Sequence, residues 1–145
     1  MPVAGVGSRH GASREGIRSV TKVDFKKKLD RYRSAPGEFR VLEVPATRYL
    51  MIDGEGDPKK APPARLDEDR LETLTEGLCV HTLHVGAFDD EGPLLARMHD
   101  EFVPGAGLRM TGRHHEIYLS DPRRTAPERL RTLLRQPVRA ASDTA

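Results

Sequence analysis

Residues 114–122 read His114-His115-Glu116-Ile117-Tyr118-Leu119-Ser120-Asp121-Pro122, and this stretch decides the fold. Side chains alternate between the two faces of a strand, so Glu116 and Tyr118 share one face. Ile117 and Leu119 share the other face, which is apolar. The Asp-Pro pair ends the strand, because proline has no N–H to donate. The pattern predicts a strand that carries a carboxylate and a phenol opposite a core face.

The residues that follow predict a helix. Thr125 and Glu128 have the spacing of a capping box, and Pro127 falls in the first helical turn. Pro137 would end this helix, because proline is not tolerated in a helix interior. The packing face of the predicted terminal helix consists of Leu130, Leu133 and Leu134.

Composition limits the classes of function. The 145 residues fit a single domain, and 24 Lys plus Arg against 22 Asp plus Glu give no strong electrostatic support to nucleic-acid binding. The single Cys79 rules out an internal disulfide framework. No apolar run reaches the roughly 18 residues of a membrane span. We expect a cytoplasmic protein without nucleic-acid or membrane partners.

The chain divides into a leader, a domain and a tail. Residues 1–20 are rich in Gly, Ser, Arg and Ala and predict a disordered leader, because they bury too little apolar surface to offset the entropy of ordering. Residues 21–139 predict a single domain, with a Pro/Lys-rich linker at 58–64. Residues 140–145 form a polar tail.

The first half of the domain predicts short elements. A helix is expected from Thr21 to Tyr32, with Lys26-Lys27-Lys28 on its surface. These lysines fit a site for an anionic partner, but a solvated helix face is the simpler interpretation. Residues 39–44 and 49–53 are β-rich and predict a hairpin or a bent strand. Residues 66–74 show weak helical spacing.

The middle of the chain predicts a central strand and a helix. Residues 78–85 are apolar on both faces, which is typical of a strand inside a sheet. An acidic loop follows, and Pro93 falls in the first turn of the next helix, which ends at Pro104-Gly-Ala-Gly107. The buried stripe of this helix consists of Leu94, Leu95, Met98 and Phe102.

Several of these stretches resemble the GyrI-like small-molecule-binding family. The matching pieces are residues 22–29, 49–58, 76–84, 89–93 and 114–137. The resemblance implies strand-helix-strand-strand modules around a ligand cleft. The family is similar to the effector domain of multidrug-responsive transcription regulators and to the gyrase-inhibitory protein. Some stand-alone members resemble hydrolases that open the cyclopropane of DNA-alkylating natural products.

One departure from the family pattern concerns the region before Glu76. Family members carry a helix and aromatic-rich strands between the Gly-Asp-Pro turn and this point, whereas this chain has a short linker there and no Trp. It looks like a member that lacks most of its first module. The expected class is α+β: an antiparallel sheet with helices on one face, forming a strand-helix-strand-strand module that is incomplete relative to the usual tandem pair.

The resemblance places Glu116 in the ligand cleft as a carboxylate anchor. Without the resemblance, an exposed charge beside a core-edge tyrosine is the favoured interpretation of Glu116. As catalytic residues, Glu116 would orient or deprotonate water, and Tyr118 would donate a hydrogen bond to the oxygen where charge develops. The expected cleft lies between strand 49–53 and strand 116–120 and binds hydrophobic or cationic aromatic compounds. Its expected ligand-binding residues are Tyr49, Met51, His84, Phe88, Glu116 and Tyr118.

Metal and nucleophile chemistry have weak support. His114 and His115 are adjacent on a strand and point to opposite faces, as do His81 and His84, so neither pair can share one ion. Cys79 sits in an apolar run and is expected to be inert. We predict neither a metal nor a cofactor.

Three functions remain open. The first is a small-molecule-binding protein, and the second is a hydrolase of strained, cyclopropane-bearing genotoxins. The third is a degenerate interaction protein without a working pocket. Such a protein would pair its open sheet edge with a partner protein or with a second copy, which would form a homodimer.

Overall fold

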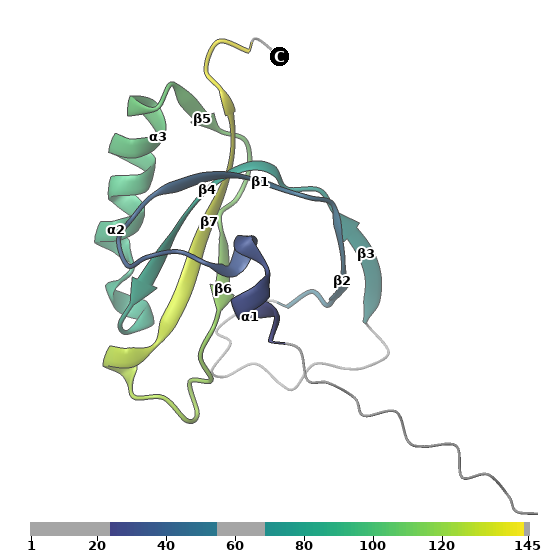
Figure 1. The fold of residues 1–145 in the computed structure, drawn as a ribbon, viewed down its shortest axis with the longest axis vertical. Helices are drawn as coiled ribbons and strands as arrows, with labels where there is room; N and C mark the ends of the chain where they lie inside the picture. Colours follow the sequence, from purple (N-terminus) through teal and green to yellow (C-terminus); the bar gives the residue numbers. More distant parts are fainter. Residues whose placement is uncertain (1–23, 55–68, 144–145) are drawn as a thin grey trace, which may run out of the picture.

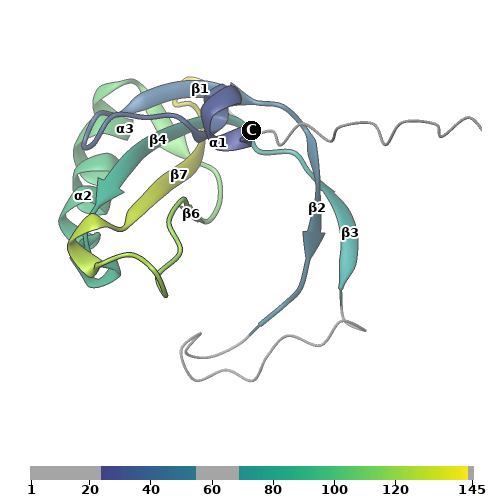
Figure 2. The same cartoon turned by 60° about the horizontal axis from the view of Figure 1, so that its bottom comes forward.

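The computed structural model describes residues 24–54 and 69–143. It shows a five-stranded antiparallel sheet with a helical segment on one face, and a two-stranded ribbon that curls away from the sheet (Figures 1 and 2). The predicted α+β class is confirmed. The predicted leader at 1–20 and the linker at 58–64 lie outside the described residues. Within those residues, no helix is both long enough and apolar enough to cross a membrane.

Two long strands form the centre of the sheet. β4 (Gly77–Val85) and β7 (Arg131–Ala140) pair antiparallel. β1 (Arg40–Val44) lies on the outer side of β4, and β6 (His115–Tyr118) and β5 (Leu108–Met110) both pair with β7. The predicted strand at 78–85 is therefore confirmed as β4, and the strand expected at 116–120 is confirmed as β6, which ends at Tyr118.

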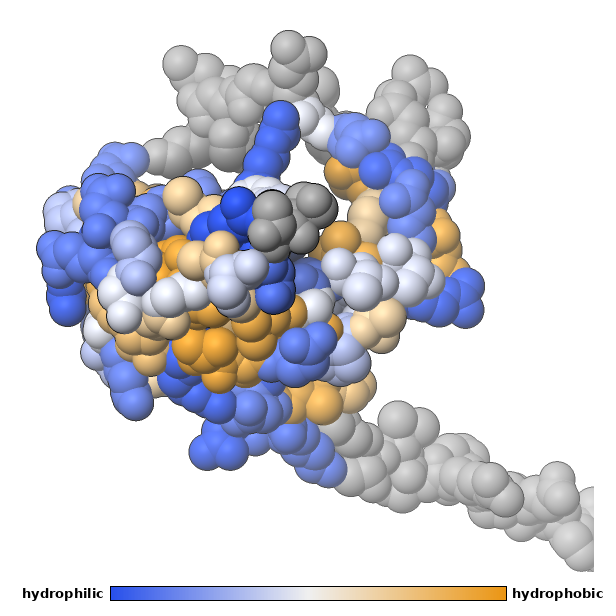
Figure 3. Space-filling model, turned by 90° about the horizontal axis from the view of Figure 1, so that it is seen from above, coloured by the Kyte–Doolittle hydropathy of each residue, from blue (hydrophilic) through white to orange (hydrophobic). Residues whose placement is uncertain are grey.

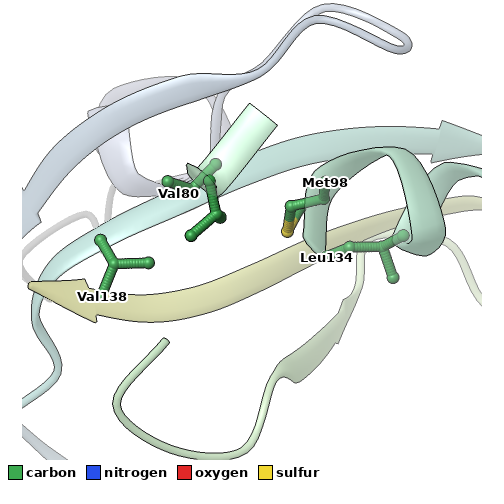
Figure 4. Close-up of a cluster of buried hydrophobic side chains, with 5 residues drawn as sticks. Val80, Met98, Leu134 and Val138 are labelled. Atoms are coloured by element: carbon green, nitrogen blue, oxygen red, sulfur yellow. The ribbon is translucent and has the colours of Figure 1, made fainter. Parts of the chain in front are cut away.

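One helical segment covers one face of the sheet. It consists of α2 (Gly92–Ala96), a π-helical stretch η4 (Arg97–Phe102) and α3 (Val103–Gly105), and it follows the short turn η3 (Phe88–Asp90). Met98 is fully buried against Val80, Leu134 and Val138 (Figure 4). The predicted helix start near Pro93 is confirmed, and so is the predicted buried stripe. The other apolar side chains packed on this core include Leu94, Leu95 and Phe102.

The predicted terminal helix is wrong, because residues 131–140 form strand β7. Only a single 3-10 turn, η5 (Pro127–Arg129), forms after the anchor stretch. Leu133 and Leu134 are both fully buried although they point to opposite faces, because strands pair on both sides of β7 and side chains cover both its faces. The tail was expected at residues 140–145. The first of these residues belongs to β7, and the N–H of the second, Ala141, donates to the carbonyl of Gly107 at 2.8 Å.

The predicted N-terminal helix is broken into two short turns. α1 (Phe25–Lys28) is capped by Asp24, whose carboxylate accepts from the N–H of Lys26 at 3.1 Å, and η1 (Asp30–Tyr32) follows. Both turns lie on the face of the sheet opposite α2, since the buried Arg135 of β7 donates to the carbonyl of Arg31.

The ribbon consists of β2 (Thr47–Met51) and β3 (Arg70–Leu74). β1 runs through a bend into β2, so the bent strand is correct and the hairpin is not (Figure 1). The weak helical spacing at 66–74 wrongly indicates a helix, because residues 70–74 form strand β3, which pairs with β2.

Apolar side chains are also present on the surface of the ribbon. Leu50 and Leu71 face each other across it, 71% and 57% exposed. Seen from the top of Figure 1, further apolar side chains gather into a central patch bordered by polar ones (Figure 3). Pairing of two copies through a sheet edge stays a prediction.

Candidate functional site

A cavity of about 260 Å³ lies between the ribbon and the sheet. Tyr49 and Met51 of β2 approach it from the ribbon, and Ile117 of β6 approaches it from the sheet. Tyr32 of η1 and Leu74 of β3 complete its apolar wall. The predicted location of the cleft, between strand 49–53 and strand 116–120, therefore coincides with a cavity.

The floor of the cavity is a buried ionic network. The guanidinium of Arg135 donates to Glu76 Oε2 at 3.0 Å, and His115 Nδ1 lies 2.8 Å from Glu76 Oε1. The side chains of Arg135 and Glu76 are only 1% and 3% exposed. Both oxygens of Glu76 are thus engaged, which is what a buried carboxylate requires.

Strand register decides which face of β6 lines the cavity. His115 pairs with Arg135 across the β6–β7 ladder, and Ile117 pairs with Leu133. Glu116 instead lies opposite Leu134, on the face that the helical segment covers. The structure therefore divides the predicted site. Tyr49 and Met51 line the cavity, whereas Glu116 and Tyr118 lie on the other side of the sheet.

Glu116 belongs to a second group of side chains near the start of α2. The hydroxyl of Tyr118 donates to Glu116 Oε2 at 2.7 Å, and the ring of Phe88 lies 5.1 Å from the ring of Tyr118. His114 Nε2 is 3.7 Å from Glu116 Oε1. Three predicted site residues, Glu116, Tyr118 and Phe88, are thus brought together here.

Glu91 joins this group and was missed by sequence reasoning. It is 5% exposed, and burial, the charge of Glu116 and a hydrogen bond with Glu116 raise its pKa to about 7. Burial and the hydrogen bond to Glu116 also raise the pKa of Tyr118 to about 12. A protonated carboxyl beside a carboxylate is an acid–base pair. The only sequence signal was that Glu91 belongs to an acidic loop before a helix, and acids at that position are commonly explained by the positive end of the helix dipole.

The remaining candidates have structural roles. His84 is buried, and its Nε2 lies 2.9 Å from the carbonyl of Ala87, so this predicted ligand-binding residue holds the loop before η3. Burial and the charge of Arg135 lower the pKa of His81 to about 4. Burial raises the pKa of Cys79 to about 11, so its thiol is not a nucleophile at neutral pH. In the part of the chain that is described, no three His, Cys, Asp or Glu side chains are placed to hold a metal ion.

A helix-covered antiparallel sheet with a cavity on its other face defines a small ligand-binding α+β domain. The chain belongs to the GyrI-like family, described as the GyrI-like small molecule binding domain, whose family model matches residues 62–139. This range is more than half of the chain and confirms the predicted resemblance. It includes Glu76, Ile117 and Arg135 of the cavity. No match is found among curated protein sequences.

Solved structures share the fold. Two are described as hydrolases from Listeria innocua; they are 26% and 25% identical to this chain, with TM-scores of 0.70 and 0.68, and cover 81% and 82% of it. A third, an uncharacterized conserved protein from the same organism, is 26% identical, with a TM-score of 0.70 and 81% coverage. All three are matched over 100% of their own chains. Loss of a first module relative to tandem members stays a prediction.

Proposed function

We propose that the protein binds small, flat, hydrophobic compounds in the cavity between β2 and β6. The observation that carries this proposal is the apolar wall, in which Tyr32, Tyr49 and Met51 surround the cavity. Aromatic rings stack on flat ligands, and the few polar groups on the floor orient them. Membership of a small-molecule-binding family supports the same function.

The charges around the cavity favour neutral over cationic ligands. The carboxylate of Glu76 already bonds Arg135 and His115, so it offers no free anchor to a cation. Glu116, the anchor expected from the sequence, lies on the opposite face of the sheet. Among the hydrophobic and cationic aromatic compounds expected from the sequence, we therefore propose the neutral hydrophobic ones as the better ligands.

Replacement of Tyr49 by alanine is expected to weaken binding of phenylnaphthylamine, a neutral aromatic dye, by roughly three- to tenfold, because one stacking ring is lost. Dye fluorescence during titration measures the affinity. The matched control is Leu50→Ala, since Leu50 is the next residue of β2 and points away from the cavity. Equal affinities for the two variants would contradict this site.

A second candidate function is hydrolysis at the pair Glu91 and Glu116. The carboxylate of Glu116 can accept a proton from water, and protonated Glu91 can supply one to the oxygen on which negative charge develops. On a spirocyclopropyl dienone, the water oxygen bonds to a ring methylene and the cyclopropane carbon–carbon bond breaks. The electron pair of the broken bond moves to the carbonyl oxygen. This oxygen takes the proton from Glu91 and becomes the hydroxyl group of a phenol. The hydrolase descriptions of two similar structures support this candidate.

Glu116→Gln is expected to abolish opening of a spirocyclopropyl dienone, because the amide cannot accept the proton from water. The absorbance of the phenol product measures the rate. The wild-type rate is expected to fall as the pH rises above about 7, since Glu91 then loses the proton that it donates. Glu128→Gln, at an exposed acid of η5, is the control. Unchanged turnover in a folded Glu116→Gln protein would exclude this mechanism.

A further inference from the structure

A second cavity, of about 490 Å³, lies near the first and is strongly basic. Lys26 and Lys27 of α1, Arg33 after η1 and Arg131 of β7 line it. Asp24 is the only acid among its lining residues. Four cationic side chains from three parts of the chain thus converge against one carboxylate, which already caps α1.

A direct contact builds this cavity. The ammonium of Lys26 donates to the carbonyl of Leu119 at 2.6 Å, which fixes α1 across the end of β6. The N–H of Leu119 donates to the carbonyl of Arg131 at 2.9 Å, so the start of β7 is held in the same place. Two of the three lysines for which a solvated helix face was the simpler interpretation, Lys26 and Lys27, therefore line a cavity.

Nearby acids do not neutralise these cations. Asp30 pairs with Arg40 at 2.8 Å, and Asp121 pairs with Arg123 at 3.1 Å. Within residues 24–54 and 69–143, no carboxylate makes an ion pair with Lys27. The cavity keeps a positive potential, which attracts anions.

The basic cavity continues the apolar one along the same face of the sheet. Ile117 of β6 lines the first cavity and Leu119, two residues later on the same face, lines the second. Tyr32 lines both cavities. The apolar cavity is slightly smaller than the roughly 300–1,000 Å³ of typical ligand pockets, so a ligand that occupies both is a better fit.

We propose that the basic cavity holds the anionic group of an aromatic ligand whose apolar body lies beside Tyr49 and Met51. This inference rests on the proposed binding function and adds the ligand class: aromatic compounds that carry a sulfonate, phosphate or carboxylate. Arg131, Arg33 and Lys27 form charge-assisted hydrogen bonds with the anionic oxygens. Tyr32 separates the apolar body from the charged end.

Two matched dyes test the inference. Anilinonaphthalene sulfonate is phenylnaphthylamine with an added sulfonate, so the difference in their affinities measures the contribution of the anionic group. The wild type is expected to bind the sulfonated dye roughly tenfold more tightly, an advantage that added salt reduces. Arg131→Gln and Lys27→Gln are each expected to weaken binding of the sulfonated dye roughly three- to tenfold. Both variants are expected to leave phenylnaphthylamine binding unchanged.

Lys28→Gln is the matched control, because Lys28 is on the same turn but does not line the cavity. Tyr49→Ala should weaken both dyes equally, which separates cavity binding from adsorption to surface cations. Equal affinities of the wild type for the two dyes, or an advantage that persists in Arg131→Gln and Lys27→Gln, would overturn the anionic subsite while leaving the apolar cavity in place. Binding of neither dye would overturn both proposals.

Discussion

Replacement of Arg135 by methionine is expected to lower the free energy of unfolding by about 3–5 kcal/mol, because it leaves the buried carboxylate of Glu76 without its cationic partner. The variant also removes the donor to the carbonyl of Arg31, which ties η1 to the sheet. Urea denaturation at neutral pH, followed by circular dichroism, measures the difference. This pair is expected to be the most sensitive electrostatic position among the described residues.

The double variant Arg135→Met/Glu76→Leu separates the pair from its surroundings. If the single variant loses stability because a charge is left unpaired, removal of both charges should restore much of the loss. Leucine also fills apolar space under the cavity. A loss below about 1 kcal/mol in Arg135→Met would show that the pair behaves like an exposed salt bridge, against its burial in the structure.

Leu133→Ala and Leu134→Ala are each expected to cost about 2–5 kcal/mol of unfolding free energy, because each removes a fully buried side chain and leaves a hole. The two residues point to opposite faces of β7, so both sides of the sheet are tested. Denaturant unfolding measures the effect, with the unfolding free energy of each variant depending on denaturant concentration as steeply as that of the wild type.

Leu50→Ala is the control for this pair of variants, since Leu50 is largely exposed and its loss should change stability by less than about 0.5 kcal/mol. A large cost for Leu134 and a small one for Leu133 would mean that the face of the sheet beneath the cavity is not packed. That result would also weaken the case for a preformed cavity on that face.

Local patterns predicted those elements whose stabilising contacts lie nearby in the sequence. Strands β4 and β6 and the helix start at Pro93 follow from alternation, burial and capping signals. The expected location of the cleft, between strand 49–53 and strand 116–120, coincides with a cavity. Alternation separates Glu116 from Ile117 but does not say which of the two faces the ribbon, because that depends on pairing with β7, which lies later in the chain.

The errors came from strands without alternation and from contacts between distant residues. Leu133 and Leu134 are both apolar because β7 is buried on both faces, and adjacent leucines then imitate a helix stripe. Glu76 and Arg135 carry no local signal of their partnership, since 59 residues separate them. Glu91 becomes a candidate acid only when the fold brings it beside Glu116.

The ribbon that forms one wall of the cavity has a further consequence. A pair of strands is only marginally stable by itself, so β2 and β3 depend on their continuity with β1 and β4. We expect the ribbon to open locally at a lower free energy than the five-stranded sheet. Local opening of the ribbon would then control ligand entry and release. A compound bound against Tyr49 would slow amide hydrogen exchange in the ribbon and leave the exchange rates of the central strands unchanged.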